Sequence, residues 1–139
     1  MLFPGSPEEQ INDNKPFPAH LFIFKENETN SYVVIYSNVP NRPDPRGPDR
    51  IFEDARDATI GKEAKPLQEL SITNNGYTGR EIEWEPKYKD EKYGQAFAVA
   101  HFFLTRNHFY EVMVSVPAQN RHATNIWYFL NSFKLSDVK

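Results

Sequence analysis

A β-hairpin signal over residues 95–116 constrains the fold of this chain more than any other feature. Two runs rich in β-favouring side chains flank Arg106 and Asn107, a pair that is typical of a tight turn. A two-residue turn places Phe103 opposite Tyr110. In this register one face carries valines and aromatic rings, and the other carries three alanines that let a helix approach closely. We therefore expect this hairpin to be buried on both faces, at the centre of a sheet.

The remaining elements are predicted around this hairpin. Four further strands are expected over residues 19–25, 31–37, 67–73 and 79–85. Amphipathic patterns predict helices near 49–60 and 120–131. Because most strands are joined as hairpins, we expect an α+β fold, an αβα sandwich with a mostly antiparallel sheet of about six or seven strands.

Length and composition indicate one domain. A chain of 139 residues is the size of an ordinary domain. Hydrophobic residues make up 39% and aromatic residues 14% of the chain, enough for one core rich in ring side chains. We therefore expect a single domain over residues 1–139.

Charge and cysteine content exclude several function classes. The net charge of −3, from 16 basic and 19 acidic residues, argues against a nucleic-acid partner. The absence of cysteine excludes disulfides, thiolate nucleophiles and zinc–sulfur sites. No run of about 18 apolar residues is present, so we expect no transmembrane segment. The first residues do not form a signal peptide, so the expected location is extracytoplasmic if a signal was removed and cytoplasmic otherwise.

Histidines and carboxylates are the candidate metal or catalytic groups. His101 and His108 share a face of the central hairpin but lie about four strand residues, roughly 13 Å, apart, so they cannot hold one metal ion. Glu81, Glu83 and Glu85 share one face of their strand, either as a solvated edge or as an acidic ridge for a cation or basic partner. No serine lies in a nucleophile elbow. We expect no catalytic residues, no metal site and no cofactor.

Several short motifs follow one another in a characteristic order. They are Phe3-Pro4-Gly5-Ser6-Pro7, Tyr32-Val33-Val34-Ile35-Tyr36, Gly79-Arg80-Glu81, Asn107-His108-Phe109-Tyr110 and Phe129-Leu130-Asn131-Ser132-Phe133. This order resembles the PsbP-like superfamily, over nearly the whole chain. The resemblance implies an αβα sandwich and a mostly non-catalytic role, since the family includes an extrinsic photosystem II subunit, a nuclear-transport factor that binds a small GTPase, bacterial envelope domains and secretion adaptors.

Two loops are the candidate binding surfaces. Tyr88 and Tyr93 flank a mixed-charge loop, and exposed tyrosines favour protein contacts. Arg42 and Arg46 lie in a stiff loop that contains four prolines, Pro40, Pro43, Pro45 and Pro48.

The residues favour a non-enzymatic binding or assembly module with an unidentified protein partner. They do not indicate an oligomeric state. The resemblance implies an association with the bacterial envelope. The alternatives are a secretion-linked chaperone or adaptor, and a small-ligand-binding protein or enzyme with a pocket between the sheet and the proline-rich loop.

Overall fold

The protein is dominated by one antiparallel sheet. The computed structural model describes residues 5–12, 19–26, 30–38, 48–61, 66–86, 89–90, 94–105, 108–122 and 124–135. The elements in chain order are β1 (Glu8–Asn12), β2 (Ala19–Lys25), β3 (Ser31–Asn38), α1 (Pro48–Ile60), β4 (Gln68–Asn74), β5 (Tyr77–Trp84), β6 (Lys89–Asp90), β7 (Gly94–Leu104), β8 (His108–Pro117), the 3-10 helix η1 (Ala118–Asn120) and α2 (Thr124–Ser132).

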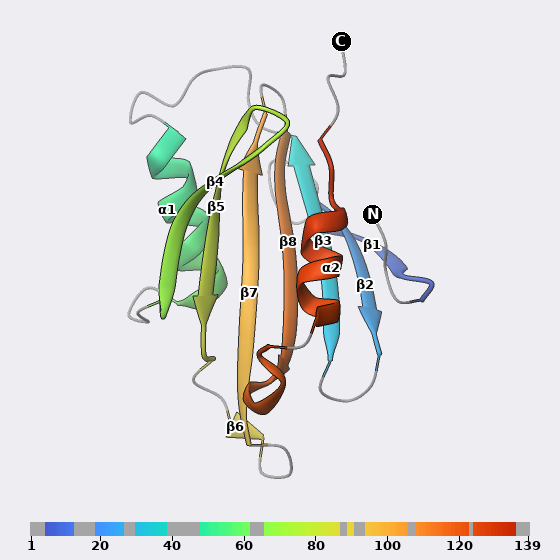
Figure 1. The fold of residues 1–139 in the computed structure, drawn as a ribbon. Helices are drawn as coiled ribbons and strands as arrows, with labels where there is room; N and C mark the ends of the chain where they lie inside the picture. The colour runs from blue at the N-terminus through green and yellow to red at the C-terminus, as the bar shows by residue number, and fades with distance from the viewer. Residues whose placement is uncertain are drawn as a thin grey trace.

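The strand order places the predicted hairpin at the centre of the sheet. The order is β1-β2-β3-β8-β7-β5-β4, with the two-residue strand β6 paired to β7 alone. All pairs are antiparallel, and the expected pairing of Phe103 with Tyr110 is confirmed. The hairpin β2–β3 joins one side of β8, while the hairpin β4–β5 joins the far side of β7 (Figure 1). The mostly antiparallel sheet expected from the sequence is therefore confirmed.

The two helices lie against opposite faces of the sheet (Figure 1). Alternate residues of β7 separate the two sides: Phe97 and Val99 pack with α2, whereas Ala98 and Ala100 pack with Phe52 of α1. The sheet is much larger than either helix, since α1 has 13 residues and α2 has nine. The helices therefore cover only part of each face.

The face beneath α1 is closed by apolar packing and by ion pairs. Phe52 is 1% exposed. The carboxylate of Glu69 on β4 forms ion pairs with Arg56 of α1, at 3.2 Å, and with Arg80 of β5, at 3.5 Å. The Thr59 hydroxyl donates a 2.6 Å hydrogen bond to the buried carboxylate of Glu111 on β8. These contacts fix α1 to the sheet along its length.

Two elements near the ends of the chain differ from the prediction. No strand is predicted before residue 19, but Glu8–Asn12 forms β1, whose backbone pairs with β2 although its side chains are mostly polar and exposed. The last helix was expected from residue 120, but η1 occupies residues 118–120 and α2 begins at Thr124. Pairing to a neighbouring strand can order a polar segment, and hydrophobic periodicity does not report such pairing.

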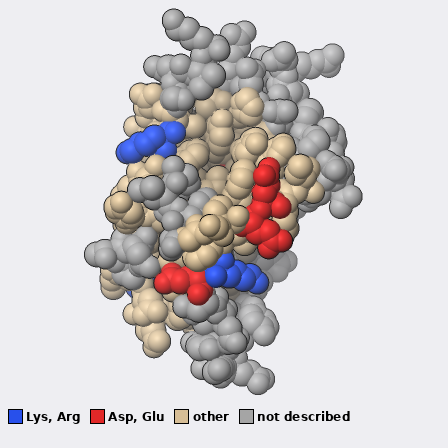
Figure 2. Space-filling model, turned by 90° about the vertical axis from the view of Figure 1, so that its right-hand side faces the viewer, with Lys and Arg blue, Asp and Glu red and all other residues tan. Residues whose placement is uncertain are grey.

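The surface of the β1 edge carries charges of both signs. In Figure 2, basic and acidic side chains of the described residues form small separate groups on this side, with no continuous basic area. No helix in the described part of the chain is long and apolar enough to cross a membrane.

Candidate functional site

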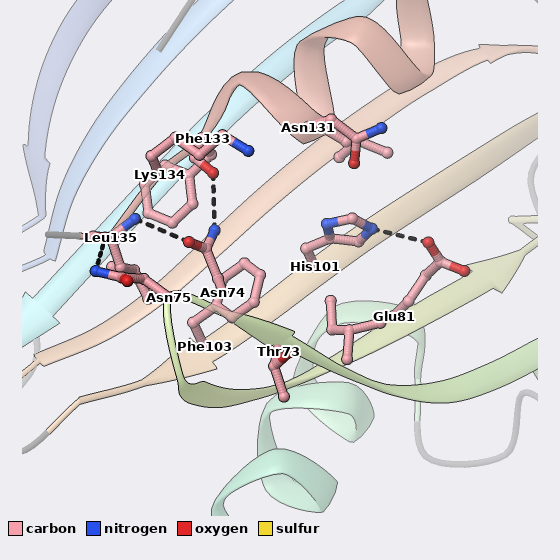
Figure 3. Close-up of a pocket in the computed structure, with 12 residues that line it drawn as sticks. Thr73, Asn74, Asn75, Glu81, His101, Phe103, Asn131, Phe133, Lys134 and Leu135 are labelled. Atoms are coloured by element: carbon pink, nitrogen blue, oxygen red, sulfur yellow. Dashed lines mark hydrogen bonds and ion pairs between the residues drawn. The ribbon is translucent and has the colours of Figure 1, made fainter.

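A pocket lies between the sheet and the chain segment that follows α2. Its volume is about 570 Å³. It is lined by Ile72, Thr73, Asn74, Asn75, Glu81, His101, Phe103, Leu130, Asn131, Phe133, Lys134 and Leu135 (Figure 3). These residues come from β4, β5, β7 and α2, from the turn after β4, and from residues 133–135. The pocket thus joins segments that are far apart in the sequence.

A buried histidine–carboxylate pair forms the inner wall of this pocket. His101 of β7 lies directly opposite Glu81 of β5 in the strand register. The Nε2 atom of His101 is 2.9 Å from Oε1 of Glu81. His101 is only 6% exposed, and the Glu81 side chain is 14% exposed. Both residues lie on the sheet face that α2 covers.

The pair leaves one imidazole nitrogen available. An ionised carboxylate only accepts hydrogen bonds, so Nε2 of His101 donates to Glu81 and Nδ1 is an acceptor in the neutral ring. No described residue hydrogen-bonds to Nδ1. In Figure 3 the ring lies between Glu81 on one side and Asn74 and Phe133 on the other, with Asn131 above it. Nδ1 is therefore an uncommitted polar atom of the inner wall.

Aromatic packing holds His101 in place. The Phe103 ring lies two residues along β7 and meets the imidazole edge-on, with centroids 6.0 Å apart. Phe103 can lie flat against the sheet because Gly79, its partner on β5, has no side chain: a Cβ there would clash with the Phe103 ring and with the Phe102 carbonyl. The glycine that begins the Gly-Arg-Glu motif is thus required by close packing at the pocket.

The outer wall is a strap, residues 133–135, held by two adjacent asparagines. The Asn74 side chain donates to the Phe133 carbonyl at 2.7 Å and accepts from the Leu135 amide at 3.0 Å. Asn75 donates to the Leu135 carbonyl at 2.9 Å. Asn75 and Gly76 both have positive φ, 49° and 85°, as a tight hairpin turn requires. The side-chain amides of these two asparagines therefore hydrogen-bond to the backbone of the strap, as the backbone of a neighbouring strand would.

The strap also begins a row of rings that crosses the sheet. Phe133 stacks on Phe103, with centroids 5.7 Å apart, and contacts Tyr110 at 5.5 Å. Tyr110 contacts Tyr36, which stacks on His20 at 4.6 Å. Burial, together with the neighbouring tyrosines, raises the pKa of Tyr110. The row extends the apolar side of the pocket across β8, β3 and β2.

Negative charge lies beside the inner wall. Glu83 is two residues along β5 from Glu81, on the same face. Burial, and next the charge of Glu81, raise the pKa of Glu83, while Arg121 and His122 oppose this shift. The interpretation of the acidic face as a solvated edge is therefore wrong for Glu81, which is a pocket residue. It holds better for Glu85, which is exposed and lies 3.5 Å from Arg121.

The four predicted binding residues, Tyr88, Tyr93, Arg42 and Arg46, lie outside the described residues. The same is true of most of the proline-rich loop, so the expected pocket between that loop and the sheet lies outside the described residues. The sequence pattern placed His101 on a strand buried on both faces and Glu81 on an acidic face of its strand, without bringing the two together. A histidine among apolar residues on a strand buried on both faces signals a polar partner, but the sequence does not name that partner.

No group of three or more potential metal ligands occurs among the described residues. The arrangement at His101 can accept a hydrogen bond from a ligand or take up a proton from one. A comparison with protein-family models and with curated proteins finds no match for this chain, so the geometry of the pocket carries the functional argument.

Proposed function

We propose that this domain binds a small polar molecule in the pocket lined by His101 and Glu81. The observation that carries the proposal is the uncommitted Nδ1 atom of a buried imidazole at the wall of a cavity of about 570 Å³. Ligand sites are usually concave, mostly apolar and supplied with a few placed polar groups, and cavities of about 300–1,000 Å³ are typical. This pocket has such a size, and its lining combines five apolar residues with seven polar ones.

A purely structural role for the pair is less well supported. Replacement of a buried ion or hydrogen-bonded pair by apolar residues is often neutral or stabilising, so such a pair adds little to stability. The opposite face of the same strands packs Ala98, Ala100 and Phe102 under α1, and its buried carboxylate, Glu111, accepts a hydrogen bond from Thr59 of that helix. The polar pair and the hollow beside it therefore favour a ligand.

The test is a fragment screen followed by two-dimensional amide NMR. We expect binding fragments to shift resonances of His101, Glu81, Phe103 and Leu135 together. Glu81→Gln removes the charge that orients the imidazole and keeps the side-chain size, and we expect it to weaken binding about tenfold, equivalent to about 1.4 kcal/mol.

Matched controls are available just after β5 and on β8. Glu85→Gln changes a carboxylate on the same face of the chain outside the pocket, and His108→Gln changes a second half-buried histidine on the same side of the sheet. Both variants should bind as the unchanged protein does. Shifts scattered over the surface, or equal affinities for Glu81→Gln and Glu85→Gln, would show that the pocket is not the binding site.

We further propose that the fold is the αβα sandwich of the PsbP-like superfamily. Helices on opposite faces of an antiparallel sheet, the close packing at Gly79 and the buried Phe129 of the C-terminal motif support this assignment. An experimental structure with a different strand order, or with both helices on one face, would contradict it.

A second candidate function is protein binding by an envelope assembly module or secretion adaptor, through Tyr88, Tyr93, Arg42 and Arg46. It is favoured by exposed apolar side chains at and beside the edge strand β4, where Leu67 is 54% and Leu70 is 43% exposed. A pull-down in which Tyr88→Ala with Tyr93→Ala loses the captured protein would support it. Unchanged capture by the double variant would exclude this site.

A further inference from the structure

The polar groups of the pocket differ between its inner and outer ends. At the inner end, Nε2 of His101 faces the carboxylate of Glu81, and in the neutral ring this leaves Nδ1 as a hydrogen-bond acceptor. A neutral ring therefore requires a hydrogen-bond donor on the ligand at this end. A hydroxyl group meets this requirement without adding charge next to the buried pair.

Lys134 provides a positively charged hydrogen-bond donor at the outer end of the pocket. It lies on the strap, is exposed, and is the one lysine or arginine among the described lining residues. Its side chain has no ion pair or hydrogen bond with any described residue. A ligand anion would give this ammonium group a partner, and a charge-assisted contact is stronger than a neutral one.

The charges around the pocket favour a ligand with one negative charge over a ligand with two. The last turn of α2 borders the pocket, and the carbonyl end of a helix carries partial negative charge. Glu81 and Glu83 add further negative potential on the sheet. A single lysine under these conditions suits a carboxylate better than a phosphate, which usually requires a helix N-terminus or several basic groups.

The apolar part of the lining defines the body of the ligand. Phe103, Phe133 and Leu130 supply apolar lining beside the inner pair and Lys134. We infer that the ligand is a small monocarboxylic acid with an aromatic or apolar body, whose hydroxyl group donates to His101 and whose carboxylate contacts Lys134. This inference rests on the proposed function, because it assigns the chemistry of the molecule that the pocket binds.

Three matched probes test the assignment by calorimetry and amide NMR: 4-hydroxybenzoate, benzoate, which lacks the donor, and 4-hydroxybenzamide, which lacks the charge. We expect 4-hydroxybenzoate to bind about tenfold more tightly than either of the others. Added salt should weaken the binding of the two acids and leave that of the amide unchanged.

Lys134→Met removes the outer contact at an exposed position, so the fold is retained. We expect it to weaken the binding of both acids about fivefold and to leave the amide unaffected, and Lys134→Arg should restore acid binding. Lys25→Met is the matched control, because Lys25 is exposed at the end of β2, outside the pocket. It should change none of the three affinities.

Equal affinities for the acid and the amide, no effect of Lys134→Met, or no binding of any probe would each overturn the assignment. These results are distinguishable from failure of the proposed function. If library fragments still bind beside His101 while the acids show no preference, the pocket is a ligand site for another class of molecule. If no fragment binds there, both proposals are wrong.

Discussion

The two faces of the central sheet belong to the same strands but are covered differently. Beneath α1, Phe52 packs on Ala98 and Ala100, and the charged groups Arg56, Glu69 and Arg80 pair with one another. On the side of α2, an apolar cluster gives way, past the end of the helix, to the pocket with its buried histidine–carboxylate pair. The part of the first face beneath α1 is closed, and the second face has the pocket past the end of α2.

This difference indicates which substitutions the domain should tolerate without losing its fold. The closed face satisfies its charges internally, and the described pocket is lined by residues from the other side and its rim. The face with the pocket keeps a polar pair and uses side-chain amides of Asn74 and Asn75 to hold the strap. Stability and binding are therefore expected to respond to different substitutions.

The largest expected effect is on the closed face. Phe52→Ala removes a ring that is 1% exposed, and we expect the free energy of unfolding to fall by about 3–5 kcal/mol in urea denaturation. Amide shifts of the pocket residues should stay unchanged, because the substitution lies on the other face. Tyr128→Ala, at a side chain that is 65% exposed on α2, is the control and should change stability by less than about 0.5 kcal/mol. Collapse of the pocket in Phe52→Ala would show that the two faces are not independent.

An intermediate effect is expected at the strap. Asn74→Ala removes two hydrogen bonds and leaves the Phe133 carbonyl and the Leu135 amide without these partners, at a cost of about 1–3 kcal/mol. Hydrogen exchange at the Leu135 amide should become faster, since that amide loses its acceptor. Asn75→Ala removes one bond, to the Leu135 carbonyl, and should have a smaller effect on exchange. Equal protection of Leu135 in Asn74→Ala and in the unchanged protein would exclude Asn74 as the group that holds the strap.

The smallest effect is expected at Glu83. Its pKa is raised in the folded protein, by burial first and by Glu81 second, so folding favours the protonated carboxyl. The stability that protonation contributes is present below the unfolded-state pKa and is lost as the pH rises through the higher folded-state pKa. Glu83→Gln should therefore raise the melting temperature slightly at neutral pH, and the gain should vanish in acid. Thermal unfolding across this pH range measures it, and a gain that persists in acid would contradict an origin in the buried charge of Glu83.

Much of the fold could be predicted from local patterns, because strands and helices differ in hydrophobic period. Alternation along 95–116 predicted both faces of the central hairpin, and a two-residue turn predicted its register; both are confirmed. The strand β1 was missed because its mostly polar side chains carry no such period. The pocket was missed for a different reason: its key pair joins β5 to β7, and a pattern within one strand does not specify a pairing with another.

The sequence by itself determined which residues share a face, since side chains alternate along any strand whatever its neighbours are. It placed Glu81 and Glu83 on one side of their strand and His101 on one side of another. Only the tertiary structure decided that these two sides are the same side of one sheet, and that the strap, residues 133–135, closes the space above them. Strand order and register depend on contacts between distant segments, and those contacts bring His101 and Glu81 together at the wall of the pocket.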